Sequence, residues 1–111
     1  MFLHLLLLTA LQTSVVPASP QCSIKGSTVV KNINKIPADV LKSFPSEMAN
    51  PNKPFRTGDA IYSGEEHWPS LRLICAYPTL RGYIVEREQG GRGYNRKKVV
   101  FRKSATGYVL E

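Results

Sequence analysis

The chain contains two cysteines, Cys22 and Cys75, whose pairing would constrain the fold more than any other sequence feature. A bridge between them closes a loop of about fifty residues. Such a crosslink lowers the entropy of the unfolded chain, an effect worth roughly 4 kcal/mol for a loop of this size. Neither cysteine has a CxxC partner or a neighbouring histidine, so we expect no metal site. We predict one disulfide, with two buried free thiols as the alternative.

An apolar segment at the N-terminus indicates the compartment in which the chain folds. Residues 2–11 are too few for the ~20 residues that span a bilayer, and small residues follow at 16–19. The segment lacks the positively charged start that secretory signals usually have. We predict a cleaved signal peptide over residues 1–18, no membrane anchor, and secretion through an oxidising route that favours the disulfide.

Residues 19–111 are then expected to form one small, strongly basic domain. The first 18 residues contain no Lys, Arg, Asp or Glu, so the formal net charge of +7 belongs entirely to this domain. A chain of this length supports one modest hydrophobic core. Strong positive charge favours polyanionic partners. We expect a monomer without a cofactor. In particular, we expect no dinucleotide cofactor, since the glycines at 90, 91 and 93 precede no helix and form no dinucleotide-binding loop.

The first half of the domain has a helical pattern. Residues 27–31 are β-prone, and the apolar residues after them recur at three- and four-residue steps, which is the spacing of one helix face: Ile33, Ile36, Val40, Leu41 and Phe44. Pro37 suits the first helical turn and Pro45 ends the helix. Residues 45–64 are rich in Pro, Asn, Ser and Gly, so we predict a loop there with one short strand at 60–62.

The second half of the domain has the pattern of strands separated by turns. We predict strands at residues 71–77 and 83–86, the first ended by Pro78 and the second by a glycine-rich turn. Residues 98–102 and 107–110 flank a short loop, as in a β-hairpin. The predicted fold class is α+β, with one short helix packed on an antiparallel sheet.

Cations concentrate near the end of the chain, between Arg92 and Lys103. Together with one aromatic residue they form our candidate nucleic-acid-binding set: Arg92, Tyr94, Arg96, Lys97, Lys98, Arg102 and Lys103. Such cations neutralise phosphates in a salt-dependent manner, and Tyr94 can stack on an unpaired base. Strand alternation sends Lys98 and Arg102 to one face and Lys103 to the other, so the charges cannot form a single stripe. The alternative is a solvated surface that only keeps the protein soluble.

The remaining aromatic and histidine residues favour structural roles. His67 lies in a turn-like segment without a placed partner, which is typical of a surface residue. Trp68 beside it is expected to pack at a loop edge rather than to anchor a partner. We expect Tyr77, Tyr83 and Tyr108 to pack across neighbouring strands.

The order of motifs resembles that of small fungal guanyl-specific ribonucleases. The resemblance runs from Cys22 through the helix to the segments 44–48, 75–80, 98–101 and 107–111. It implies a microbial-ribonuclease-like fold. That chemistry needs a carboxylate base and an imidazole acid, but the resemblance places Ala76 at the base and Ser46 and Glu111 at the two histidines. Only Lys98, or Arg96 in a shifted register, would still meet a phosphate, so we expect a pseudo-ribonuclease with no catalytic residues.

A secreted ribonuclease-like protein without catalytic residues resembles the effectors of plant-pathogenic fungi, especially powdery mildews. This resemblance implies a virulence protein that is secreted, reaches the host cytoplasm, and binds host RNA or a host protein through its basic surface. A plant immune receptor is a further expected partner.

Two other functions stay open. One is an active secreted ribonuclease or ribotoxin whose acid and base come from Glu86, Glu88, Glu111 and His67. The other is a basic protein that disrupts anionic membranes, which is disfavoured because the sequence has no long amphipathic basic helix.

Overall fold

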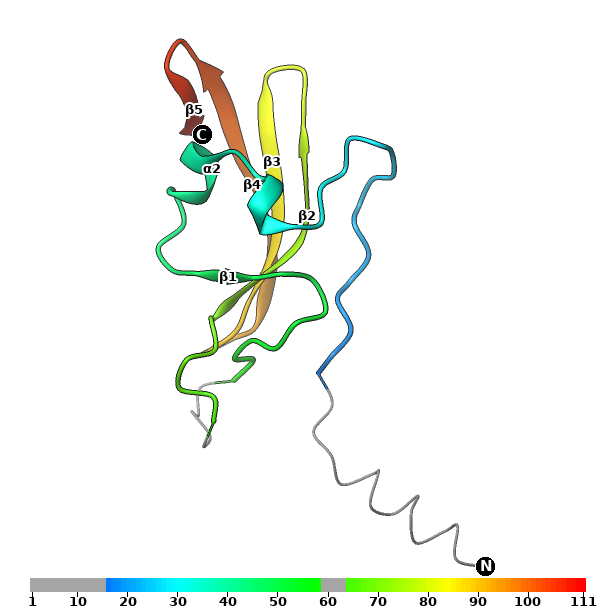
Figure 1. Ribbon diagram of the computed structural model, residues 1–111, viewed down its shortest axis with the longest axis vertical. Helices are drawn as coiled ribbons and strands as arrows, with labels where there is room; N and C mark the ends of the chain where they lie inside the picture. Colours follow the sequence, from blue (N-terminus) through cyan, green and yellow to red (C-terminus); the bar gives the residue numbers. More distant parts are fainter. Residues whose placement is uncertain (1–15, 59–63) are drawn as a thin grey trace, which may run out of the picture.

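A computed structural model describes residues 16–58 and 64–111 of the chain, and it shows an α+β fold (Figure 1). A 3₁₀ turn, η1 (Ile33–Lys35), is followed by one short helix, α2 (Ala38–Leu41). The strands come after them: β1 (Met48–Ala49), β2 (Leu71–Pro78), β3 (Gly82–Gln89), β4 (Asn95–Ser104) and β5 (Gly107–Leu110). The predicted strand at 60–62 and most of the predicted signal peptide lie outside the described residues.

The five strands form one curled sheet in the order β1-β2-β3-β4-β5. Strands β2 to β5 are antiparallel neighbours, and the predicted hairpin between β4 and β5 is confirmed, with Ser104 opposite Gly107. Strand β1 runs parallel to β2, with Met48 opposite Leu71, so the prediction of a purely antiparallel sheet is wrong. A parallel neighbour requires a long connection, which the segment between β1 and β2 supplies.

The one predicted short helix is present as α2, which begins directly after Pro37, but Ile33 of the predicted apolar face lies outside it in η1. The residue before a proline is disfavoured in the helical region, and Ile36 has φ −83° and ψ 138°. Chain geometry therefore separates η1 from α2, although the predicted apolar face still points to the core. The β-prone residues 27–31 form no strand, and Val30 makes only an isolated bridge with Ala76.

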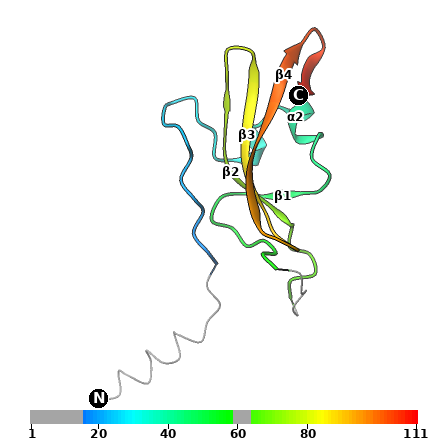
Figure 2. The same ribbon diagram turned by 180° about the vertical axis from the view of Figure 1, so that it is seen from behind.

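The hydrophobic core lies between η1, α2 and one face of the sheet, which we call the helix face (Figures 1 and 2). It is built from buried apolar residues of the helical segment and of all strands but β5: Ile36, Val40, Met48, Leu71, Leu73, Ala76, Tyr83, Val85 and Phe101. Phe44 packs on Phe101 with ring centroids 5.9 Å apart. Tyr83 of β3 and Tyr108 of β5 are not on neighbouring strands, but their rings pack against each other across β4 with centroids 5.6 Å apart.

One carboxylate connects the helix to the last strand. Asp39 of α2 accepts a hydrogen bond of 2.6 Å from the backbone N–H of Tyr108. Gly107 is required beside it for two reasons: its φ is +138°, and a Cβ there would collide with the Asp39 carboxylate. Nothing in the sequence pattern indicates this contact.

The predicted disulfide between Cys22 and Cys75 is confirmed, with the two Cα atoms 5.7 Å apart. It attaches the N-terminal segment, residues 16–23, to β2 on the sheet face opposite the helix, which we call the open face. None of the helices in the described ranges has the length and apolar character needed to cross a bilayer.

Replacing both cysteines, as Cys22→Ser/Cys75→Ser, is expected to lower the free energy of unfolding by about 4 kcal/mol, because the bridge spans a separation of 53 residues. Urea denaturation of the oxidised protein and the double variant measures this difference. The reduced wild-type protein serves as a control and should unfold like the variant. Equal midpoints for all three forms would contradict a stabilising role for the bridge.

Candidate nucleic-acid interface

All seven candidate residues lie on β4 or in the turn before it, and all are exposed to solvent. Their register on the sheet divides the charged side chains between two faces. Arg96, Lys98 and Arg102 share the open face with Glu88 and Glu86 of β3, whereas Lys97 and Lys103 lie on the helix face. The structure therefore places the cations on one strand and the turn before it, but on two faces of the sheet, as strand alternation requires.

The open face is organised around a buried ion pair that the sequence analysis missed. The Arg72 Nε atom lies 2.7 Å from a Glu88 carboxylate oxygen, with both side chains almost fully buried. A second guanidinium nitrogen donates to the other carboxylate oxygen at 3.2 Å, making the pair bidentate. The third nitrogen donates to the carbonyls of Pro17 and Lys53, and the guanidinium stacks 4.4 Å from the ring centre of Phe55.

This ion pair fixes Tyr94, the aromatic residue of the candidate set. The Tyr94 hydroxyl donates a hydrogen bond of 2.6 Å to Glu88. Desolvation and the hydrogen bond to the Glu88 carboxylate raise the pKa of Tyr94 to about 12. The residue nevertheless keeps 47% of its surface exposed, so its hydroxyl end is anchored while part of it faces solvent.

Glu86 occupies the next position along the open face and is also held by hydrogen bonds. Tyr77 donates to it at 2.7 Å, and both the backbone N–H and the hydroxyl of Ser23 donate to it. Burial acts to raise the pKa of Glu86, but the hydrogen bonds from Ser23 and Tyr77 and the charge of Lys98 outweigh burial and lower it. Glu86 is therefore a stable carboxylate rather than a group poised to exchange a proton near neutral pH.

Of the other residues considered for catalysis, Glu88 lies beside Glu86 on the open face but is held in the buried ion pair with Arg72. His67 is exposed on the turn that precedes β2, and Trp68 beside it is half-buried. The Glu86 carboxylate does lie near the sulfur atoms of Cys22 and Cys75. Both sulfurs are joined in the disulfide and offer no thiolate, so this cluster has no metal-binding chemistry.

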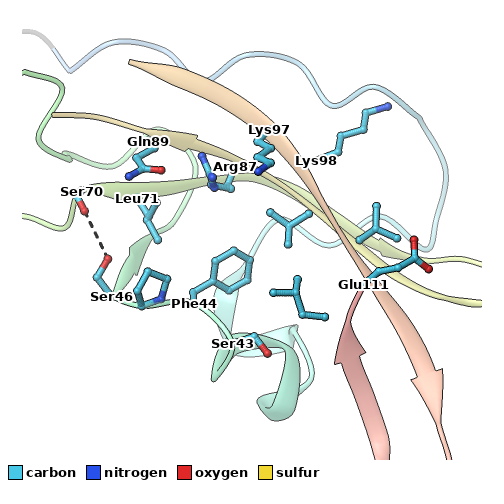
Figure 3. A pocket seen from close by; sticks show the side chains of 14 residues that line it. Ser43, Phe44, Ser46, Ser70, Leu71, Arg87, Gln89, Lys97, Lys98 and Glu111 are labelled. Atoms are coloured by element: carbon cyan, nitrogen blue, oxygen red, sulfur yellow. Dashed lines mark hydrogen bonds between the residues drawn. The ribbon is translucent and has the colours of Figure 1, made fainter. Parts of the chain in front are cut away.

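A groove of about 570 Å³ opens on the helix face, beneath β4 (Figure 3). Three of the positions that the ribonuclease resemblance singled out line it: Ser46, Lys98 and Glu111. Figure 3 shows the Lys98 side chain directed away from the groove. Ala76, the fourth position, is fully buried in the hydrophobic core.

Arg87 also lines the groove, and the sequence analysis did not identify it as a candidate residue. Figure 3 shows Arg87 and Lys97 together at one side of the groove, with Phe44 facing them across it. Arg87 was missed because the predicted strand ended at Glu86, whereas β3 continues to Gln89. The alternation of charge at 86–88 was the available signal, since it indicates a strand with one acidic and one basic side.

Gly90, at the start of the glycine-rich turn, has a packing role. Its backbone N–H donates to the Ser70 carbonyl at 2.8 Å. A Cβ at this position would collide with the backbone of Arg56, so only glycine fits. Gly91 and Gly93 have φ values of +95° and +76°, which a turn needs and which glycine adopts without strain.

Comparison with known protein families, with characterised proteins and with solved structures finds no match for this chain.

The buried ion pair generates a stability prediction. Arg72→Met leaves the Glu88 carboxylate buried without its main partner, so we expect the free energy of unfolding to fall by about 3–5 kcal/mol. The double variant Arg72→Met/Glu88→Leu removes both charges and should unfold closer to the wild-type protein than Arg72→Met does. Urea denaturation of these three proteins and of the single variant Glu88→Leu completes the cycle that gives the coupling energy. Additive effects of the two substitutions would show that the pair is not energetically coupled.

The raised pKa of Tyr94 generates a titration prediction. The ultraviolet absorbance of tyrosinate, compared between the wild-type protein and Tyr94→Phe, should show that this residue ionises at about pH 12 rather than near 10. Because the folded-state pKa is the higher one, the contribution of Tyr94 to stability is complete below pH 10 and disappears as the pH rises toward 12. Ionisation of Tyr94 near pH 10 in the folded protein would exclude the hydrogen bond to Glu88.

Proposed function

We propose that this protein binds RNA through the open face of β4 and does not cleave it. The observation that supports the proposal most directly is the exposure of Arg96, Lys98 and Arg102 on one face of a single strand. Successive residues on one face of a strand are ~6–7 Å apart, so Arg96 and Lys98 are spaced for neighbouring phosphates, and Arg102 follows beyond Val100 at about twice that spacing. Binding of this type depends on charge and shows little preference for base sequence.

The cations of β4 can contact phosphates because, among the described residues, none of them forms an ion pair with a carboxylate. In the described part of the chain, the one ion pair within 4.0 Å is the buried pair of Arg72 and Glu88. The acids opposite β4 accept hydrogen bonds from other residues, Glu88 from Arg72 and Tyr94 and Glu86 from Ser23 and Tyr77, while the charge of Lys98 also acts on Glu86. The formal net charge of +7 adds a long-range attraction for any polyanion.

Tyr94 supplies the second element that single-stranded RNA requires. Aromatic side chains beside a cationic track stack on successive bases, which contributes about 1–3 kcal/mol per base. The Tyr94 hydroxyl is anchored on Glu88 while the residue stays half-exposed next to Arg96. A ring held in this way loses little conformational entropy when a base stacks on it.

The proposal that RNA is not cleaved is supported by the groups at the positions where the ribonuclease resemblance would require proton transfer. Ala76 has no ionisable group, and it is fully buried. Glu86 has a lowered pKa and three hydrogen bonds, which make it a weak base. We therefore keep the ribonuclease-like, catalytically inactive interpretation as part of the proposal, with secretion and action as a fungal effector on RNA in the host cytoplasm as its biological setting.

Fluorescence anisotropy with a labelled single-stranded RNA that carries a 5′-hydroxyl tests the proposal. The triple variant Arg96→Gln/Lys98→Gln/Arg102→Gln should bind at least about tenfold more weakly, and its slope of log K against log salt should fall by about 2. The matched control is Lys31→Gln/Lys35→Gln/Lys42→Gln, which removes the same charge from exposed residues elsewhere. Equal losses in the two triple variants would leave only a general charge effect and refute this interface.

Incubation of the purified protein with end-labelled RNA tests the absence of catalysis. We expect intact RNA at all times. New fragments that disappear with Glu111→Gln or His67→Ala would establish the alternative, an active ribonuclease, and would overturn the non-catalytic part of the proposal. The anisotropy experiment is evaluated separately, because binding can persist when cleavage does not occur.

A further inference from the structure

The strand pair β3–β4 carries one cross-strand pair of like charges. On the open face each acid of β3 stands opposite a cation of β4, Glu86 opposite Lys98 and Glu88 opposite Arg96. On the helix face Arg87 stands directly opposite Lys97. Opposite charges at such positions stabilise a sheet, whereas like charges destabilise it. The Arg87–Lys97 pair is therefore unfavourable in the protein alone and would become favourable with an anion between the two cations.

The surroundings of Arg87 also favour the binding of an anion to its guanidinium. The side chain is half-buried, and desolvation lowers the pKa of Arg87. Its guanidinium donates a hydrogen bond of 2.8 Å to the Asn95 side-chain oxygen, which carries no charge. Among residues 16–58 and 64–111, no carboxylate lies within 4.0 Å of Arg87 or Lys97. A partly desolvated cation that is paired only with a neutral oxygen retains its full charge for a ligand.

The groove beside this pair has the size and lining of a site for a small organic molecule. Its volume is about 570 Å³, within the usual range of ~300–1,000 Å³ for such sites. Phe44, Leu71, Val99 and Leu110 contribute apolar surface, and Ser46 and Ser70 contribute hydroxyls that lie 3.5 Å from each other. The ligand that fits this lining has a strongly anionic group at one end and a ring-sized apolar body.

We propose that this groove binds a nucleoside monophosphate, with its phosphomonoester between Arg87 and Lys97 and its base against Phe44. A phosphomonoester carries about −1.5 to −2 charges at neutral pH, which matches two cations better than a carboxylate does. The same chemical group occurs in a free mononucleotide and at the 5′ end of an RNA. The second source rests on the proposed RNA-binding function and would add recognition of an RNA end to binding along the open face.

Isothermal titration calorimetry with 5′-AMP, adenosine and inorganic phosphate tests the site. We expect 5′-AMP to bind at least about tenfold more tightly than either fragment, since only the nucleotide uses both ends of the groove. Arg87→Gln and Lys97→Gln should each weaken 5′-AMP binding about tenfold, because each removes a charge-assisted contact. Lys103→Gln is the matched control, because Lys103 lies on the same face of β4 but does not line the groove. Equal weakening by the control, or no binding of 5′-AMP, would overturn the proposal.

The variant Lys97→Glu separates a ligand site from a merely structural pair. It converts the like-charged pair into an opposite-charged one, so the Tm of the ligand-free protein should rise by about 1–5 °C. The same substitution should abolish 5′-AMP binding. A lower Tm would show that Lys97 supports the fold instead, and a raised Tm with unchanged 5′-AMP binding would place the nucleotide elsewhere. Either result overturns the proposed site.

Two RNA oligonucleotides of one sequence, with a 5′-phosphate or a 5′-hydroxyl, identify the source of the phosphomonoester. Tighter binding of the phosphorylated RNA that Arg87→Gln eliminates supports recognition of an RNA end. Equal binding of the two RNAs, with 5′-AMP still bound, supports a free mononucleotide. Failure of 5′-AMP binding while the 5′-hydroxyl RNA still depends on Arg96, Lys98 and Arg102 refutes the groove and leaves the proposed RNA binding intact.

Discussion

The buried ion pair of Arg72 and Glu88 connects several separate segments of this structure. It joins the central strands β2 and β3 on the face that lacks a hydrophobic core. Through the same two side chains it also holds the N-terminal segment, the loop at Lys53 and the hydroxyl of Tyr94. Removal of either charge would leave the other buried and unpaired, so the positions of these separate segments depend on one ion pair.

The two faces of β4 have different electrostatics because of the residues that β3 places opposite them. The open face alternates acids and bases between neighbouring strands, and its acids are satisfied by hydrogen bonds from Ser23, Tyr77 and Tyr94. The helix face brings Arg87 and Lys97 together at the edge of an apolar groove. Strand β4 thus has cations on both faces, and we propose that the open face binds a polyanion and the helix face a small anion.

The strands β2 to β5 could be predicted because apolar runs and turn residues are local signals. The disulfide could be predicted because two cysteines in a chain expected to be secreted have one pairing. The start of the helix was also encoded locally, since Pro37 was placed in the first helical turn and α2 begins directly after it. Non-local features escaped prediction. The parallel pairing of β1, the partner of Arg72 and the position of Arg87 opposite Lys97 depend on strand register, which no local pattern in this sequence specifies.

The carbonyl of Pro17 gives the buried guanidinium of Arg72 one of its acceptors, at 2.8 Å. This residue belongs to the segment that the predicted signal peptidase cut after residue 18 would remove. A chain processed there keeps the carbonyl of Lys53 as the acceptor for the same nitrogen, whereas a chain cut before residue 17 keeps both. The cleavage position would therefore determine how many protein carbonyls accept hydrogen bonds from the buried Arg72 guanidinium. Mature chains with different N-termini would then differ in thermal stability.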